Sequence, residues 1–296
     1  MSSSLPVVFS LSGTSLTDEE ARFFEDHPPF GFILFRRNID TPEQLQTLTT
    51  SLKNITYTGC HILIDQEGGR VQRLNEPHWP QYSCMQDCAD EDSLQKTIAN
   101  ISKDLTQAGI DVNCAPVMDV LQPETDISIG DRAFSKHPEI VAKLGTLACQ
   151  TFLENGITPI IKHLPGHGRA VVDSHKEIPY VTADLETLRH TDFLPFQHVV
   201  RELKDQDIWG MVGHCIYNAL DPDLPASLSP KVIQEIIRGE IGLSGLLFSD
   251  DLSMGALESY GDVAARAKAC LQAGCDIALY CHGDLEEMKA IVQRIS

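Results

Sequence analysis

The sequence predicts an α/β protein, a single (β/α)8 TIM-type barrel that occupies residues 1–296. Eight short apolar runs recur along the chain, a stretch with helical periodicity follows each of them, and no Pro/Gly-rich linker interrupts the alternation. Eight such units in a chain of this length close most naturally into a barrel. A doubly wound open sheet is the alternative, but it would need a glycine-rich phosphate loop after an early strand, and none is found there.

Each predicted strand is a short run of β-branched or apolar residues bounded by polar residues or turn signals. The runs cover residues 7–11, 31–35, 61–65, 111–117, 158–163, 210–216, 245–250 and 276–281.

Helix signals separate these strands. Thr41 is followed by Pro42 and by Gln44, which together give an N-cap, a proline at the first helical position and a capping box. A later helix begins after Ser229, and Gly239 is predicted to end it. The predicted helices cover roughly residues 18–26, 42–52, 94–105, 138–154, 184–202, 231–238, 262–273 and 284–295.

The connections differ in length between the two ends of the predicted barrel. Helix-to-strand turns are short, whereas several strand-to-helix segments are long, namely 66–90, 118–136, 164–183 and 217–229. Long loops at the carboxyl ends of the strands are where such barrels build their active sites. The active-site face is therefore predicted before any motif is considered.

The charge balance excludes several classes of partner. With 23 basic and 42 acidic residues the chain has a formal charge of −19 at pH 7, whereas nucleic acids and anionic membranes require a basic surface. No Lys or Arg precedes Arg22, so no secretory signal is predicted, and no apolar segment is long enough to cross a membrane. We expect a cytoplasmic protein, and the strongly acidic surface favours a monomer.

The cysteines do not form a metal-binding pattern. Three of the nine, Cys114, Cys215 and Cys281, lie inside predicted strands, where reduced thiols behave as small hydrophobes. Cys84 and Cys88 have a C-x3-C spacing, but no second pair completes a zinc site. No metal and no other cofactor is expected.

Titratable residues gather at the predicted strand ends. Asp65 ends the third strand and precedes Gly68-Gly69, a pattern that suits close approach of the backbone to a ligand but also fits a salt-bridged turn.

In the fifth unit Lys162-His163 is followed within fourteen residues by Asp173 and His175. A single His is more often structural, yet four titratable residues within one such segment beside a barrel mouth favour catalysis. Asp173 could hold the His175 imidazole in one tautomer, and an imidazole exchanges protons readily near neutrality.

The seventh predicted strand ends in two adjacent acids, Asp250 and Asp251, and a strand tip is where a barrel positions a carboxylate nucleophile. Neighbouring strand residues face opposite sides, so only one of the two can face the barrel axis, and the spacing leaves open which one does. Asp119 and His214 are expected to support the site through hydrogen bonds.

Six segments carry the chemistry-bearing residues in order: DQEGGRVQRL at 65–74, APVMDV at 115–120, GDRAF at 130–134, KHLPGHG at 162–168, DSHKEIPY at 173–180 and FSDDLSM at 248–254. Taken together, they resemble the bacterial β-N-acetylglucosaminidases of glycoside hydrolase family 3, in particular the single-domain cytoplasmic enzymes that recycle peptidoglycan. The resemblance extends from about residue 5 to the C-terminus.

This resemblance implies a role for each candidate residue. Asp250, rather than Asp251, would be the nucleophile, His175 the acid/base and Asp173 its dyad partner. The reaction would retain the anomeric configuration, with His175 acting as base when water resolves the glycosyl-enzyme. The substrate would be a small muropeptide, GlcNAc-1,6-anhydro-MurNAc with or without its peptide. The implied substrate-binding residues are Asp65, Arg73, Arg132, Lys162 and His163.

Two departures from the family pattern stand out. Leu164 replaces a more frequent Phe, which changes the packing of the loop more than its chemistry. The chain also lacks the second domain of many relatives, so we expect one catalytic domain over residues 1–296. Gly166 and Gly168 would then allow the loop 164–183 to swing over the pocket as a lid.

Three other functions fit parts of the sequence. A β-N-acetylglucosaminide phosphorylase could use the same site, because neutral His175 would not repel phosphate. A metal-dependent hydrolase could use His163, His167, His175 and Asp250 as ligands, but the first strand lacks the His-x-His that such a barrel would need. A catalytically silent sugar-binding barrel would lack a nucleophile or an acid/base, and candidates for both are present.

Overall fold

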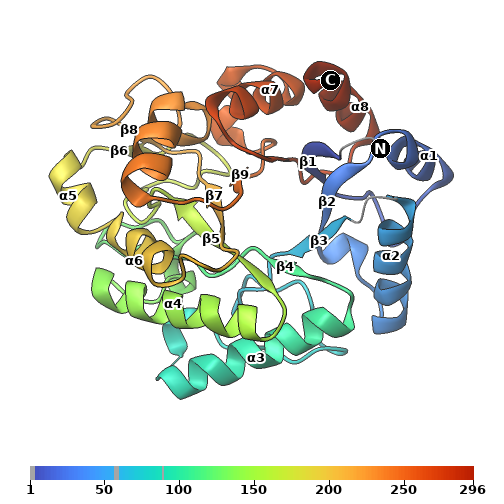
Figure 1. The fold of residues 1–296 in the computed structure, drawn as a ribbon, viewed down its shortest axis with the longest axis horizontal. Helices are drawn as coiled ribbons and strands as arrows, with labels where there is room; N and C mark the ends of the chain where they lie inside the picture. The colour runs from blue at the N-terminus through green and yellow to red at the C-terminus, as the bar shows by residue number, and fades with distance from the viewer. Residues whose placement is uncertain (1–3, 57–59, 89) are drawn as a thin grey trace.

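The computed structural model describes residues 4–56, 60–88 and 90–296, and its centre is a parallel eight-stranded sheet surrounded by helices (Figure 1). The order of the strands is β10-β1-β2-β3-β4-β5-β7-β9, and a further parallel bridge between Phe248 and Ile277 joins the two ends of the sheet. The predicted (β/α)8 barrel is therefore confirmed. The strands are β1 (Leu5–Phe9), β2 (Pro29–Leu34), β3 (His61–Ile64), β4 (Val112–Asn113), β5 (Thr158–Leu164), β7 (Trp209–Val212), β9 (Leu247–Ser249) and β10 (Ala278–Leu279).

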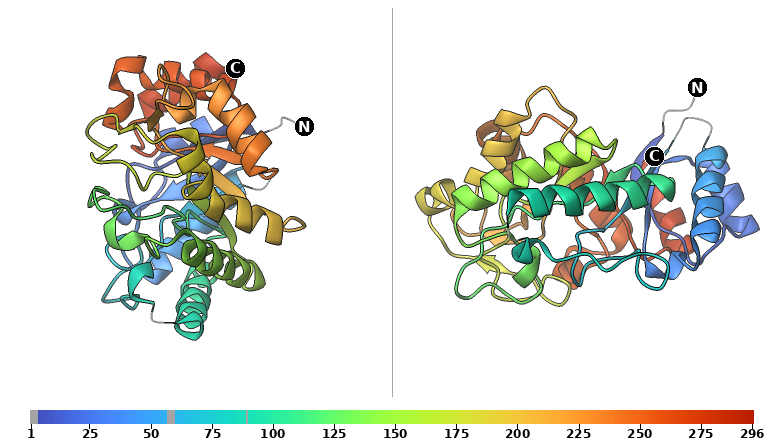
Figure 2. Two further views of the ribbon diagram at one scale, coloured as in Figure 1. Left: turned by 90° about the vertical axis from the view of Figure 1, so that its left-hand side faces the viewer. Right: turned by 90° about the horizontal axis from the view of Figure 1, so that it is seen from below.

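The helices form the outer layer, and α3 and α4 pack side by side along one flank of the barrel (Figure 2). Six N-caps are Thr or Asp residues whose side chains accept from the backbone N–H three positions on, which satisfies donors that the helix leaves free. The bounds are α1 (Asp18–Asp26), α2 (Pro42–Ile55), α3 (Glu91–Gln107), α4 (Pro138–Glu154), α5 (Leu185–His190), α6 (Leu194–Glu202), α7 (Val263–Ala273), α8 (Leu285–Ile295) and the π-helical η5 (Val232–Ile241).

Two of the helix predictions were wrong in detail. The helix expected over 184–202 is divided into α5 and α6, and Pro195 lies in the first turn of α6, where its missing N–H costs nothing but would break a continuous helix. Gly239 does not end η5. The helix continues to Ile241, which is buried, and Gly242 ends it in the left-handed conformation at φ 85°.

Two strand predictions were also too long. The run 111–117 contributes only β4 to the barrel, with Val117 forming one further bridge to Lys162. The run 210–216 is divided, because the chain leaves the barrel after β7 and residues Ile216–Tyr217 (β8) pair instead with Tyr180–Val181 (β6). This additional two-stranded sheet ties the segment that follows β5 to the segment that follows β7.

The barrel interior is a packed core. Side chains from all eight strands or their ends fill it, and the Trp209 and Phe248 rings stack at 5.5 Å between centroids. A second, larger core lies between the strands and the surrounding helices. All nine cysteines are free, and Cys114 and Cys281 belong to the interior core. Because the interior is filled, a ligand can enter only at a mouth of the barrel.

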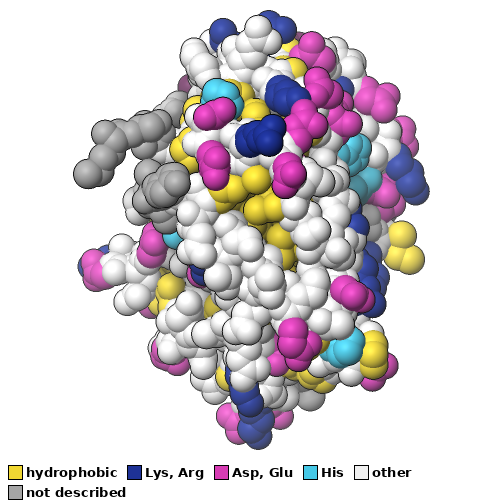
Figure 3. Space-filling model, turned by 90° about the vertical axis from the view of Figure 1, so that its right-hand side faces the viewer, with side chains coloured by type: hydrophobic (Ala, Val, Ile, Leu, Met, Phe, Trp, Pro, Cys, Tyr) yellow, Lys and Arg dark blue, Asp and Glu magenta, His cyan; other side chains and the backbone are white. Residues whose placement is uncertain are grey.

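Acidic side chains are spread over the face shown in Figure 3, interspersed with single or paired basic ones, and no continuous basic stripe crosses this face. No helix among the described residues is long and apolar enough to span a membrane.

Candidate active site

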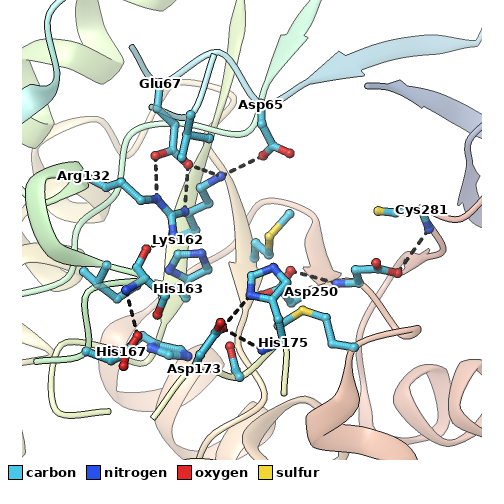
Figure 4. Close-up of a pocket in the computed structure, with 18 of the residues that line it drawn as sticks. Asp65, Glu67, Arg132, Lys162, His163, His167, Asp173, His175, Asp250 and Cys281 are labelled. Atoms are coloured by element: carbon cyan, nitrogen blue, oxygen red, sulfur yellow. Dashed lines mark hydrogen bonds and ion pairs between the residues drawn. The ribbon is translucent and has the colours of Figure 1, made fainter. Parts of the chain in front are cut away.

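A cavity of about 560 Å³ opens at the carboxyl ends of the barrel strands (Figure 4). Its walls come from the segments that follow β3, β4, β5 and β9. The first three of these are long loops singled out above, whereas the fourth long loop, 217–229, does not line the cavity. The volume lies in the range of small-molecule sites. The cavity thus occupies the face that the loop lengths predicted.

One wall of the cavity is a network of buried ions centred on Lys162, which lies on β5. Its Nζ is 2.9 Å from Oδ1 of Asp65 and 2.7 Å from Oε1 of Glu67. Arg132 donates two hydrogen bonds, of 2.8 and 2.9 Å, to the same Glu67 carboxylate. Arg73 donates to Asp65 over 3.2 Å, and its other two guanidinium nitrogens find no acceptor among the described residues. The Arg73 guanidinium therefore has N–H donors that could bind a polar ligand in the cavity.

Mutual attraction keeps these groups charged. Burial opposes ionisation of Asp65, but Lys162 and Arg73 outweigh it and lower the pKa of Asp65 well below its usual range. Burial likewise opposes ionisation of Glu67, and Arg132 and Lys162 lower its pKa to about 2. On the cationic side, Asp65 and Glu67 raise the pKa of Lys162 despite its burial. The wall thus presents fixed charges at neutral pH.

Glu67 is the member of this network that the sequence analysis did not assign to the site. It follows Asp65 by two positions and precedes Gly68, whose positive φ of 93° and close approach to the Ser83 carbonyl turn the chain back over the barrel mouth. The available signal was the acidic pair before Gly-Gly, but only the fold shows that the partners are Lys162 and Arg132.

A second group of residues surrounds Asp119, which is fully buried after β4. Its Oδ1 accepts from the backbone N–H of His163 at 3.2 Å and of His167 at 2.7 Å, and its Oδ2 lies 2.7 Å from Nδ1 of His163. Gly168 permits this packing, because a Cβ there would overlap the carbonyl oxygen of Val120. Both imidazoles line the cavity. The supporting role expected of Asp119 fits this arrangement.

Asp173 and His175 form a second carboxylate–imidazole pair, at the rim. Oδ1 of Asp173 lies 2.8 Å from Nδ1 of His175 and also accepts its backbone N–H at 3.0 Å. Burial acts against ionisation of Asp173, but these donors prevail and lower its pKa. The His175 side chain is 66% exposed. The backbone carbonyls of Ser174 and His175 accept from the segment after β9, which fixes the pair beside Asp250 in this structure.

The two adjacent acids after β9 differ in their bonding. Asp251 accepts from the N–H and hydroxyl of Ser253 and from the N–H of Cys281, so both of its carboxylate oxygens are bonded to the protein. Among the described residues, Asp250 accepts only the N–H of Asp251, at 2.8 Å. Burial disfavours its ionised form, but His163, His214 and this N–H lower the pKa of Asp250. Of the two carboxylates, that of Asp250 accepts fewer hydrogen bonds from the described residues.

All eight site residues predicted from the sequence line this one cavity. They are Asp65, Arg73, Arg132, Lys162, His163, Asp173, His175 and Asp250. His214 lies beneath it, bonded to Ser227 and to the carbonyl of Asp251.

The donor set of the cavity bears on the metal-dependent alternative. Within residues 4–56, 60–88 and 90–296, no group of three or more His, Cys, Asp or Glu side chains is arranged to hold a metal ion. His163 and His175, which that alternative would use as ligands, each direct Nδ1 to a carboxylate.

Comparison with known proteins identifies relatives over nearly the whole chain. Residues 9–296 match the model of the glycosyl hydrolase family 3 N-terminal domain. A β-hexosaminidase of Alkalilimnicola ehrlichii is 38% identical over 94% of this chain and 80% of its own, and one of Pseudomonas aeruginosa is 35% identical over 98% and 86%.

Solved structures of family 3 enzymes have the same fold over nearly the whole chain. NagZ from Neisseria gonorrhoeae in complex with N-trifluoroacetyl-D-glucosamine superposes with a TM-score of 0.86 at 31% identity, covering 99% of this chain and 90% of that one. A family 3 β-N-acetylglucosaminidase from Paenibacillus gives a TM-score of 0.90 at 31% identity, and this chain spans 56% of its length.

Proposed function

Since the chain belongs to glycosyl hydrolase family 3, we propose that it is a retaining exo-β-N-acetylglucosaminidase that acts on peptidoglycan fragments of the GlcNAc-1,6-anhydro-MurNAc type. Relatives named β-hexosaminidase support the hexosaminidase activity, and the Neisseria relative binds an N-acylated glucosamine. The observation that carries the proposal is the uncommitted carboxylate of Asp250 in the same cavity as the Asp173–His175 pair.

In the first step Asp250 attacks the anomeric carbon and His175 gives a proton to the leaving oxygen. In the second step His175 takes a proton from water, which displaces Asp250 and restores the β configuration. Asp173 holds Nδ1 of His175, so that Nε2 faces the reacting oxygen in both steps. The exposure of His175 suits this role, because the leaving group and the water both arrive from the rim.

The ionic wall is assigned to the terminal sugar. Asp65, Lys162 and Arg73 retain unused lone pairs or N–H donors on the cavity side, and sugar hydroxyls both donate and accept. Arg132 and His163 complete this set. The charged partners keep these side chains in fixed positions, which is what binding a sugar in one orientation requires.

All of these residues come from the barrel, which supports catalysis by a single domain over residues 1–296 working as a monomer. A cytoplasmic location is part of the same proposal, and cell fractionation with an antibody to the chain tests it.

The experiment compares aryl β-N-acetylglucosaminide with aryl β-glucoside, and then GlcNAc-1,6-anhydro-MurNAc with and without its peptide. We expect turnover of the N-acetyl substrates, with GlcNAc released as the β-anomer at early times by NMR. Turnover of the glucoside alone would contradict the sugar class, and release of the α-anomer first would contradict retention.

Phosphorolysis is the second candidate, because the proposed acid/base is an imidazole and not a carboxylate, which would repel an incoming phosphate. Adding phosphate to the assay and looking for GlcNAc-1-phosphate distinguishes the two reactions.

A further inference from the structure

The cavity contains two carboxylate–imidazole pairs, and the proposed reaction uses only one as its acid/base. The pair at the rim, Asp173–His175, is exposed. The other pair, Asp119–His163, lies deep in the wall, where the Asp119 side chain is 0% exposed and that of His163 is 7% exposed. A fully buried carboxylate is costly unless donors satisfy it, so the function of Asp119 calls for an explanation.

We propose that Asp119 is a positioning residue that keeps the proton of His163 on Nδ1, so that Nε2 faces the cavity as the sugar-contacting atom. This inference rests on the proposed function, because it deepens the role of His163 in binding the terminal sugar.

The geometry leaves little choice for the proton. An ionised carboxylate only accepts hydrogen bonds, and Oδ2 of Asp119 lies 2.7 Å from Nδ1 of His163, so Nδ1 must donate. Burial opposes the ionisation of Asp119, yet His163 and His167 outweigh it and lower the pKa of the carboxyl. Nε2 of His163 has no partner among the described residues, and the ring lines the cavity. A neutral imidazole in this tautomer offers Nε2 as an acceptor.

The same carboxylate fixes the position of the ring as well as its tautomer. Oδ1 accepts the backbone N–H groups of both His163 and His167, so both ends of the 163–167 turn are held by one oxygen. The chain packs closely against this turn at Gly213, the residue that follows β7. A Cβ at Gly213 would lie 3.2 Å from the His167 ring and 3.3 Å from Cβ of His163. The His163 and His167 rings are 5.4 Å apart between centroids.

Other charged groups surround His163, and each could influence it. Lys162 is its neighbour on β5, and His167 lies on the turn that follows. Three more groups interact electrostatically with this pair: Asp250 after β9, His214 after β7 and Arg132 of the 3-10 turn η3 (Gly130–Arg132). Among the residues that the structure describes, Asp119 alone accepts a hydrogen bond from the His163 ring, and this singles it out as the group that sets the tautomer.

Asp119→Asn is the informative variant, because it keeps the size of the side chain and one acceptor oxygen. The amide oxygen can still accept the two backbone N–H groups, whereas the amide NH2 is a donor placed opposite Nδ1 of His163. The imidazole must then carry its proton on Nε2 to accept this donor. Asp173→Asn is the matched variant, since it makes the same substitution at the rim pair.

The direct readout is ¹⁵N NMR of histidine-labelled protein, with the His163 resonances identified by their loss in His163→Gln. We expect protonated Nδ1 in the wild type and protonated Nε2 in Asp119→Asn, with Asp173→Asn leaving His163 unchanged. Protonated Nε2 with bare Nδ1 in the wild type would overturn the proposal. This measurement needs no substrate, so it stands apart from any failure of the proposed activity, and the wild-type spectrum decides even if Asp119→Asn does not fold.

Kinetics on aryl β-N-acetylglucosaminides gives the second readout. We expect Asp119→Asn to lower kcat/KM by about 10- to 100-fold, by the same factor for good and poor leaving groups, and to weaken inhibition by free GlcNAc. Asp173→Asn should instead lose more activity as the pKa of the leaving group rises, because this substitution impairs proton donation by His175 to the leaving oxygen. A leaving-group dependence in Asp119→Asn equal to that in Asp173→Asn, or unchanged inhibition by GlcNAc, would contradict a role in sugar contact.

Discussion

Lys162 and Glu67 form an ion pair of 2.7 Å inside the barrel mouth, where only 3% and 2% of their side chains are exposed. Ions so deeply buried are tolerated only when every charge is compensated. Here Lys162 has a second carboxylate partner, Asp65, and Arg132 donates a hydrogen bond to each carboxylate oxygen of Glu67. The pair therefore joins the loop after β3 to β5 and fixes one wall of the cavity.

Glu67→Gln is expected to destabilise the fold by about 3–5 kcal/mol, because it leaves Lys162 and Arg132 buried with one anion fewer. Urea unfolding followed by circular dichroism measures this change. The matched control is Glu240→Gln, which breaks the surface pair with Arg189 and should change the unfolding free energy little. Equal effects of the two substitutions would show that the buried network does not stabilise the fold.

Asp173→Asn is expected to lower kcat by roughly 10²- to 10⁴-fold on substrates whose leaving group needs a proton. With an activated dinitrophenyl leaving group the loss in the first step should be small, since little protonation is required. Steady-state kinetics over a series of aryl β-N-acetylglucosaminides gives the comparison. Asp126→Asn is the control, because Asp126 is also a cavity carboxylate but bonds to the N–H of Ser128 and to no imidazole. A uniform loss across the series would argue against acid catalysis by this pair.

Acid should destabilise the fold through His167. Burial and the neighbouring His163 lower the pKa of His167 to about 4 in the folded protein, against about 6.5 in the unfolded chain. Between these values the unfolded state binds a proton that the folded state refuses, so stability falls as the pH drops from 6.5 to 4, by up to about 1.4 kcal/mol per pH unit. Urea midpoints across this range should show a shallower slope in His167→Gln than in the wild type. His190→Gln, on exposed α5, is the control, and an unaltered slope in His167→Gln would contradict the assignment.

Much of the fold could be predicted because its signals are local. The Thr41 N-cap and Pro42 place the start of α2, and the alternation of apolar runs and helices indicates the barrel. The predicted capping box was wrong in one bond, because the Gln44 side chain accepts from the N–H of Asp40 and not from that of Thr41. The end of η5 was misplaced because Gly239 is as good a stop signal as Gly242, and burial of Ile241 decides between them. The division of 184–202 was signalled by Pro195, which would break a continuous helix but is tolerated in the first turn of α6; the helical periodicity on both sides of it concealed the break.

The site was harder to derive than the fold, because its bonds connect residues distant in sequence. Spacing alone left Asp250 and Asp251 equivalent, and family resemblance selected Asp250. The structure adds a physical difference, since Ser253 and Cys281 occupy the Asp251 carboxylate. Glu67 escaped assignment because its partners are 65 and 95 positions away, as Arg132 and Lys162. No local pattern reveals contacts of that range.

The most direct test of the central claim is chromophore release from an aryl β-N-acetylglucosaminide by the wild type, Asp250→Asn and Asp251→Asn under the same conditions. We expect a loss on the order of 10⁴-fold for Asp250→Asn and a clearly smaller loss for Asp251→Asn, with both variants folded by circular dichroism. Retained activity in Asp250→Asn together with collapse in Asp251→Asn would contradict the assignment of the nucleophile, and with it the mechanism built on this cavity.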